Sequence, residues 1–270
     1  MRVELTVLGS GTSLGVPTIG CRCPVCLSSN PRDKRTRPSI LLRYNNHTVM
    51  IDTGPDFRTQ ALRASIDRLD AVLYTHAHAD HILGLDDTRA FTLQQGVVIP
   101  IYGNRQAIAG IHRVFQYIFD GNYPYGGVAL LEEHVITGPL KLFGLEVIPI
   151  PVIHGHLEVL GFRFGPVAYL TDFNHLPESS LDLLRGLDVV IIDALRHEPH
   201  PAHLTVEQAL RQVEKIQPRQ AFFTHMAHDL GHEETNASLP DHVRLCYDGM
   251  QVGFETDPVP GSSAARKGTR

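Results

Sequence analysis

Short apolar runs separated by polar turns dominate the pattern of this chain. Runs of about four to eight residues rich in Val, Ile and Leu are typical of buried strands. On this basis we expect strands at 3–8, 39–44, 47–52, 70–75, 146–153, 160–164, 167–171, 187–193, 220–224 and 250–254. Apolar residues that recur about three or four positions apart indicate helices, and they predict 57–65, 82–91, 104–119, 178–185 and 205–216. The strands cluster between single helices, which favours an α/β sandwich of mixed sheets with outer helices over a fully parallel sheet.

The composition is that of an ordinary globular protein, with 43% apolar and 20% charged residues. A net charge of -5 argues against an obligate nucleic-acid binder, which would usually show a basic face. No apolar run approaches the roughly 18 residues that span a bilayer, and the first residues alternate like a strand instead of forming a signal peptide. We therefore expect a cytoplasmic protein without membrane contact. Whether it forms a homodimer is left open.

Metal-ligating residue types are concentrated directly after the apolar run 71–74. Three imidazoles and one carboxylate follow it: His76, His78, Asp80 and His81. Their spacing does not match one helical face, where neighbours are three or four residues apart, so an irregular turn must present them. Imidazole and carboxylate suit zinc, manganese or iron better than calcium or magnesium. The alternative is a surface turn in a chain that has 16 His residues.

Three further apolar runs stop at a residue of the same chemical type. His154 follows 147–153, Asp172 follows 167–171, and His225 follows 220–224. A single His at a strand end is more often an ordinary hydrogen-bonding residue. The repetition of the pattern instead predicts that several strand ends bring ligands to one edge of a sheet.

This order of residues resembles the metallo-β-lactamase superfamily of dinuclear metallohydrolases, and the resemblance extends over most of the chain. It implies a four-layer αββα sandwich of two mixed β-sheets flanked by helices. It also implies two divalent metal ions, zinc or manganese. The implied ligands of the first metal are His76, His78 and His154, and those of the second are Asp80, His81 and His225, with Asp172 bridging both.

Two assignments within this set have competitors. His156 competes with His154, which we prefer because Gly155 follows it, as in the similar proteins. Asp52 matches an early Asp of the superfamily, which the resemblance implies is a partner held behind a ligand His. The alternative for Asp52 is an ordinary turn residue before Gly54.

The Gly-rich segment 8–26 resembles a narrower group, the phosphoribosyl 1,2-cyclic phosphodiesterase branch. Cys21, Cys23 and Cys26 offer three thiolates, and a tetrahedral structural zinc needs a fourth ligand. His228 would supply that ligand, which would tie the zinc to the catalytic centre through nearby His225. The alternatives are free buried thiols for the three Cys and an ordinary role for His228.

These ligand candidates extend from residue 21 to residue 228 without an intervening linker. We therefore expect a single metallo-β-lactamase-like hydrolase domain over 1–256. Residues 257–270 are small and polar, and we predict that they form a disordered tail.

The charge of such a centre indicates the substrate. Two divalent cations with Asp80, Asp172 and a bridging hydroxide keep about one positive charge, which suits a phosphodiester monoanion attacked by that hydroxide. The leaving alkoxide needs a proton. His203 precedes a helix with Thr205 as its expected N-cap, and the resemblance implies a general-acid role for a His in this place. His197 and His200 are alternative donors, and His203 could also be an ordinary surface residue.

The catalytic candidates are thus His203 and Asp80, and the expected reaction is metal-dependent hydrolysis of a small phosphodiester, with a cyclic ribose phosphate as the first candidate. The enzyme alternatives of the same fold are a tRNA-processing-like nuclease and a metalloenzyme of quinone-cofactor biosynthesis. Nucleases of that kind usually carry a substrate-gripping arm, and the sequence shows no basic Gly/Pro-rich insertion that would form one. A non-catalytic metal-binding protein is the remaining option.

Overall fold

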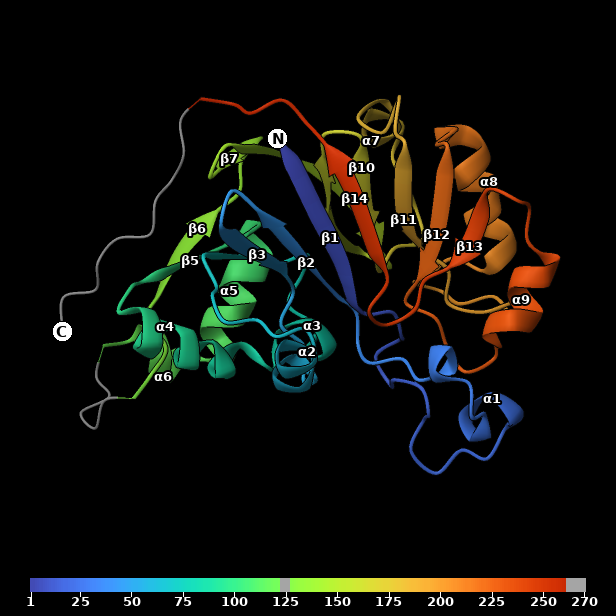
Figure 1. Cartoon of the computed structure of the whole chain (residues 1–270), viewed down its shortest axis with the longest axis horizontal. Coiled ribbons are helices and arrows are strands. Elements are labelled where there is room, and N and C mark those ends of the chain that lie inside the picture. Colours follow the sequence, from blue (N-terminus) through green and yellow to red (C-terminus); the bar gives the residue numbers. More distant parts are fainter. Residues whose placement is uncertain (122–126, 261–270) are drawn as a thin grey trace.

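The computed structural model describes residues 1–121 and 127–260, so residues 261–270 of the predicted tail lie outside the described residues. Two seven-stranded sheets pack face to face in this part of the chain, as Figure 1 shows. In spatial order the first sheet contains β14 (Gln251–Glu255), β1 (Arg2–Gly9), β2 (Ser39–Tyr44), β3 (His47–Ile51), β4 (Ala71–Leu73), β5 (Ile99–Gly103) and β6 (Leu131–Val135). The second contains β13 (Val243–Leu245), β12 (Gln220–Thr224), β11 (Val189–Asp193), β10 (Val167–Leu170), β9 (Leu157–Phe164), β8 (Leu145–His154) and β7 (Leu140–Leu142).

All the predicted strands are present, and four further strands were not predicted: β5, β6, β7 and β13. Two of them, β7 and β13, are only three residues long. β6 has the sequence LEEHV, which is half-buried and too polar to appear as an apolar run. β6, β7 and β13 lie at edges of the sheets, where apolar runs are short or polar, whereas β5 is an interior strand.

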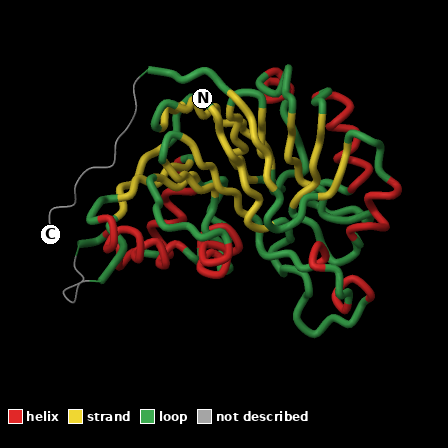
Figure 2. Tube along the Cα trace, in the orientation of Figure 1, coloured by secondary structure: helices red, strands yellow, loops and turns green. Residues whose placement is uncertain are grey.

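Helices cover the outer faces of both sheets, which is also visible in the tube of Figure 2. Their bounds are α1 (Pro24–Leu27), α2 (Phe57–Arg63), α3 (Ala79–Ile82), α4 (Arg89–Gln95), α5 (Arg105–Val114), α6 (Gln116–Phe119), α7 (Glu178–Asp182), α8 (Val206–Ile216) and α9 (His232–Ser238), with 3-10 turns at Pro31–Asp33 and Leu85–Thr88. Every helix in the described residues is too short or too polar to cross a bilayer.

The predicted helix 82–91 was wrong as a single element. The structure has α3, a 3-10 turn and α4 instead, because the chain turns at Gly84 against the segment that follows β3. The Gly84 N–H donates to the Thr53 carbonyl at 2.8 Å, and a Cβ on Gly84 would lie 2.2 Å from the Gly54 carbonyl oxygen. The predicted helix 104–119 is also divided, at Phe115, into α5 and α6.

Two hydrophobic cores account for the layers. The larger one fills the space between the sheets and extends beneath α8, whose Val206, Ala209 and Val213 are buried. The second core packs α2, α4 and α5 onto the outer face of the first sheet, and it includes Phe57, Phe91 and Ile111 from these helices and Val72 from β4. This arrangement confirms the predicted four-layer αββα sandwich.

Strand direction decides where the functional residues lie. In the first sheet β3 and β4 are parallel, and in the second sheet β10, β11 and β12 are parallel. β8 runs in the same direction as β10, because each pairs antiparallel with β9. The carboxyl ends of these strands therefore emerge together at one edge of their sheet, the usual position of sites in such sheets.

Candidate metal centre

Three imidazoles gather at the carboxyl ends of β4 and β8. His76 and His78 follow β4, and His154 is the last residue of β8. The ring centroids of His154 lie 5.4 Å from His76 and 5.0 Å from His78, and one ligand nitrogen of each ring lies within 4.8 Å of the others. His154 Nδ1 donates to the Ala202 carbonyl at 2.9 Å, which leaves Nε2 as the nitrogen that can bind a cation. His156, the competitor, is exposed and is not in this group.

A second group combines two carboxylates with two imidazoles. Asp80 and His81 lie in α3, while Asp172 and His225 follow β10 and β12. His225 Nε2 lies 2.8 Å from Asp172 Oδ2 and 3.5 Å from Asp80 Oδ2, and His81 Nε2 lies 3.1 Å from Asp172 Oδ1. All four side chains are buried.

The orientation of these imidazoles fits a bound cation better than a set of ion pairs. The Nε2 atoms of His81 and His225 are buried beside carboxylates, yet neither makes an aligned hydrogen bond, and the same is true of His76 Nε2. Buried polar nitrogens without partners are costly. Nitrogen and carboxylate oxygen atoms that converge on one point are the donor set of zinc or manganese. The residues present therefore fit two divalent cations.

Asp172 lies between the two groups. Its ligand oxygens fall within 4.8 Å of His154 and His203 in one cluster, and of Asp80, His81 and His225 in another. This is the position that a carboxylate shared by two cations would need. The bridging role remains a prediction, but the geometry required for it is present.

The protonation states differ between the groups. Burial lowers the pKa of His76, His78 and His154, so these imidazoles are neutral near pH 7, as metal binding requires. Burial acts in the same direction on His225, but the adjacent Asp172 outweighs it and raises the pKa of His225 to about 10. Asp172 and Asp80 likewise raise the pKa of His81 against the effect of its burial.

Asp52 supports the second group from behind. Its Oδ2 lies 2.7 Å from His81 Nδ1, and the Thr75 backbone N–H and hydroxyl donate to its two oxygens at 2.9 and 2.8 Å. This contact fixes Nδ1 of His81 as the protonated nitrogen and leaves Nε2 toward the cluster. These contacts are the geometry that the predicted partner role requires, and the role itself stays a prediction.

Backbone strain accompanies this geometry. Asp52, Asp172 and His225 have φ values of 62°, 54° and 60°, in the left-handed region that costs an ordinary residue about 1–2 kcal/mol. Each follows a strand, so a sharp change of direction turns its side chain into the site. Strain that is retained at such positions is typical of functional residues.

His203 lies beside both groups. Its ring centroid is 4.7 Å from that of His154 and 4.6 Å from that of His225, and the residue is buried. Of the two alternative donors, His200 lies behind His203 at 5.0 Å, and its Nδ1 accepts from the Ala202 N–H. His197 is exposed and belongs to none of the ligand groups in the described residues.

Sequence reasoning missed Asp193, which holds His203 in place. This buried carboxylate ends β11; its Oδ1 lies 3.2 Å from His203 Nδ1, and its Oδ2 accepts from the Leu204 N–H at 3.0 Å. The same Oδ1 lies 3.7 Å from His225 Nδ1. The signal was available, because Asp193 ends the apolar run 189–192 in the same way that Asp172 ends its own run.

Cys21, Cys23, Cys26 and His228 form a separate cluster beneath the sheet edge. The Nδ1 of His228 lies 3.1, 3.5 and 3.4 Å from the three sulfurs in that order. A tetrahedral zinc with ordinary bond lengths would place such atoms about 3.6 Å apart. Backbone N–H groups of Thr18, Cys23 and Cys26 donate to the sulfurs, which stabilises thiolates. The four side chains fit one structural zinc.

One buried cation connects this cluster to the metal centre. The Arg35 side chain is fully buried and donates from Nη1 to the Ala227 carbonyl at 3.1 Å and from Nη2 to the Leu230 carbonyl. Ala227 lies in the short segment between His225 and His228. Arg35 therefore anchors the backbone that carries one ligand of each cluster.

Comparison with known proteins places these residues in a family context. The model of the Beta-lactamase superfamily domain matches residues 47–226, a range that includes both ligand groups of the candidate centre. The crystal structure of a new diphosphatase from the PhnP family superposes with a TM-score of 0.90 at 49% identity, covering 95% of this chain and 99% of that one.

Two curated proteins show more distant similarity. An octanoyltransferase of Porphyromonas gingivalis is 38% identical over 251 residues, which cover 91% of this chain but only 50% of that protein. A ribonuclease Z of Bradyrhizobium diazoefficiens is 30% identical over 192 residues, covering 64% of this chain and 61% of that protein. The chain thus spans only about half to three fifths of the length of these relatives.

Proposed function

Because this chain belongs to the β-lactamase superfamily, we propose that it is a metal-dependent hydrolase that cleaves a phosphorus–oxygen bond of a small phosphodiester. The observation that carries the proposal is the convergence of two ligand groups and a buried His203 at one edge of the sandwich. Ligands alone would fit a metal-binding protein, whereas an imidazole held beside them provides a proton for a leaving group.

His76, His78 and His154 would hold one divalent cation, Asp80, His81 and His225 the other, with Asp172 shared between them. When bound, such cations lower the pKa of a shared water and stabilise negative charge on phosphoryl oxygens. Cys21, Cys23, Cys26 and His228 would hold a structural zinc.

Two side chains would act on the reacting groups, one on the attacking water and one on the leaving oxygen. Burial alone would raise the pKa of Asp80, but the neighbouring His81 holds this pKa well below its usual range. The carboxylate is therefore ionised and can orient an attacking water. Asp193 faces Nδ1 of His203, which leaves Nε2 as the nitrogen that donates a proton to the leaving oxygen. His203 is therefore the proposed general acid, and Asp193 orients it.

Two substrate classes have specific support. A cyclic ribose phosphate agrees with the N-terminal Cys pattern, and a diphosphate linkage agrees with the similarity to the diphosphatase from the PhnP family, at 49% identity. Both present a singly charged phosphoryl group with an oxygen leaving group, so the same residues would serve either. We place the phosphodiester first and the diphosphate second.

The test is hydrolysis of bis(p-nitrophenyl) phosphate by protein of measured metal content, followed by a panel of cyclic ribose phosphates, dinucleoside diphosphates and tRNA precursors. We expect turnover of the first compound and a clear preference for one of the two small-molecule classes. No turnover by fully metal-loaded protein would exclude a phosphodiesterase, and a preference for tRNA would favour the nuclease alternative.

A further inference from the structure

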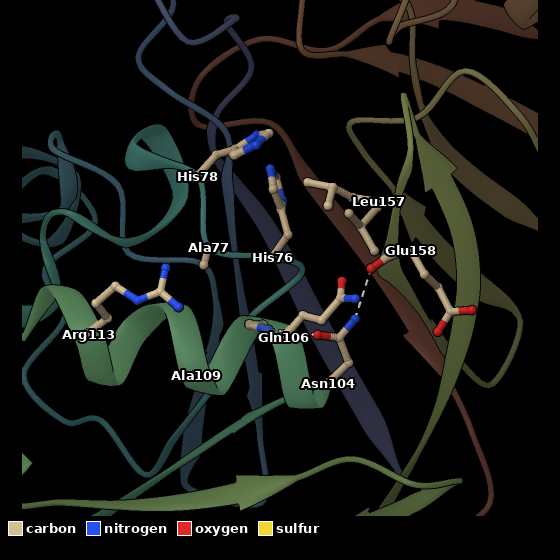
Figure 3. Close-up of a pocket in the computed structure, with 11 residues that line it drawn as sticks. His76, Ala77, His78, Asn104, Gln106, Ala109, Arg113, Leu157 and Glu158 are labelled. Atoms are coloured by element: carbon tan, nitrogen blue, oxygen red, sulfur yellow. Dashed lines mark hydrogen bonds between the residues drawn. The ribbon is translucent and has the colours of Figure 1, made fainter.

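A pocket of about 360 Å³ opens directly beside His76 and His78, between α5 and the start of β9 (Figure 3). Much of its wall is apolar, formed by Ala77, Ala109, Leu157 and Val159. A pocket of this size adjoining the ligands can hold the part of a substrate that does not react. The polar groups along its wall determine which ligands the pocket binds.

One face of α5 forms the wall nearest the ligands. Gln106, Ala109, Gly110 and Arg113 are spaced at intervals that place them on a single helical face. Gly110 lets the backbone approach, since a Cβ on it would lie 2.5 Å from the Cβ of Ala77. Arg113 is three residues from Gly110, about 4.5 Å along the helix axis. The tight contact thus places the backbone of this part of α5 close to the loop that carries His76 and His78.

Arg113 is the charged group that this wall offers to a ligand. In Figure 3 its guanidinium extends from α5 toward the loop that carries Ala77 and His78. It is exposed, and within the described part of the chain no carboxylate, hydrogen bond or ring contacts it. Glu158 does not neutralise it, because the Glu158 carboxylate points away from the pocket while its backbone carbonyl accepts from Asn104 Nδ2 at 2.9 Å.

We propose that Arg113 is a specificity determinant that binds a second anionic group of the substrate, joined to the reacting phosphate through an uncharged spacer that occupies the apolar part of the pocket. The proposal rests on the proposed function for the identity of the reacting group. A planar guanidinium binds phosphate or carboxylate through two parallel hydrogen bonds. Gln106 stands on the same face and can hydrogen-bond the spacer.

Two probes that differ in one phosphate test this proposal. They are thymidine 5′-(p-nitrophenyl phosphate) and its 3′-phosphorylated form, assayed with metal-loaded protein. We expect kcat/KM to be about tenfold or more higher for the 3′-phosphorylated probe, because charge-assisted hydrogen bonds are the strong ones. Arg113→Ala should bring the ratio of the two values close to one, and Arg113→Lys should restore only part of it.

Arg105→Ala is the matched control. It removes the same charge from the same helix, but Arg105 is exposed and does not line the pocket. We expect this variant to keep the wild-type ratio. A wild-type ratio near one, or a ratio that survives in Arg113→Ala, would overturn the proposal.

A binding measurement separates this proposal from the proposed function. Calorimetric titration with thymidine 3′,5′-bisphosphate and thymidine 5′-phosphate needs no turnover. We expect the bisphosphate to bind about tenfold or more tightly to the wild type, and equally with the monophosphate to Arg113→Ala. Absence of turnover with this binding difference intact would exclude the hydrolase and leave the anion site standing. Turnover without a binding difference would support the hydrolase and exclude the anion site at Arg113.

Discussion

At the scale of single side chains, the proposed proton donor is the feature that would separate a hydrolase from a plain metal-binding protein. His203 is buried between His154 and His225, and Asp193 contacts its Nδ1 at 3.2 Å. His200 and His197 lie farther from the ligand groups. A general acid matters only when the leaving group needs a proton, which provides a direct test of the assignment.

His203→Ala should therefore slow hydrolysis of substrates with alkyl leaving groups by about 10²–10⁴-fold, and of p-nitrophenyl esters by less than about tenfold. Asp193→Asn should show the same selectivity to a smaller degree, because the imidazole remains but is no longer held by a carboxylate. The measurement is kcat/KM across a leaving-group series, with His197→Ala as control. Equal losses on both substrate types would contradict the role of His203.

The raised pKa values of His81 and His225 lead to a second prediction. The pKa of His225 is raised to about 10, so at pH 7 its imidazole carries an extra proton. A cation can bind only the neutral ring. Adding zinc or manganese to chelator-treated protein at pH 7 should therefore release protons, and the affinity of the second group should increase with pH. Calorimetry in buffers of different ionisation enthalpy measures this release. A buffer-independent enthalpy together with a pH-independent affinity would contradict it.

At the scale of elements, the ends of buried strands were the most predictable part of the site. His76, His154, Asp172 and His225 each follow an apolar run, so the sequence places them at strand ends before any pairing is known. Asp193 follows the same rule, but an Asp after a strand is also a common turn residue, so the pattern alone does not assign it to the site. The role of Arg113 could not be predicted, because helical periodicity does not show which loop a helix packs against.

The contact between α5 and the ligand loop can be tested through Gly110→Ala. Alanine favours a helix over glycine by about 1 kcal/mol, but its Cβ would meet Ala77 at 2.5 Å and force the helix or the loop to move. We expect the melting temperature to change little and kcat/KM to fall about tenfold or more, since small displacements of reacting groups are costly.

Gly138→Ala is the control for this variant, because nothing lies within 4 Å of a Cβ at Gly138. It should retain both activity and metal content. Wild-type kinetics in Gly110→Ala would show that the loop tolerates displacement of α5 and that the contact does not position the ligands.

At the scale of the whole molecule, the Cys cluster joins the N-terminal segment to the segment after β12. Residue 21 and residue 228 are far apart in sequence, yet their ligand atoms lie 3.1 Å apart. In the sequence, only the residue types suggest that these two segments share a zinc. The predicted strands and helices do not show that the segments lie side by side. The Arg35 side chain is buried and donates to the Ala227 carbonyl in the second of these segments.

Cys26→Ser should therefore remove one zinc per chain and lower stability by about 2 kcal/mol or more, which corresponds to about 4–8 °C in melting temperature. It should also weaken metal binding at His225, since the zinc and that ligand share one short segment. Metal analysis and thermal unfolding check both effects. Cys246→Ala is the control: Cys246 is buried away from the cluster, so the variant should keep its full metal content. Unchanged zinc content in Cys26→Ser would disprove the site.

The antiparallel pairing of β1 with β14 has a consequence for engineering. β1 runs in the direction of β3, so it starts at the margin of the sheet opposite the ligands, and β14 returns to that same margin. The Met1 amino group donates to the Thr256 carbonyl there, as the proximity of the N label to β14 in Figure 1 also shows. Reporter proteins or affinity tags attached at residue 1 or residue 256 would project away from the substrate entrance. A short peptide bridging these two positions would permit circular permutation, with new ends opened in an exposed surface loop.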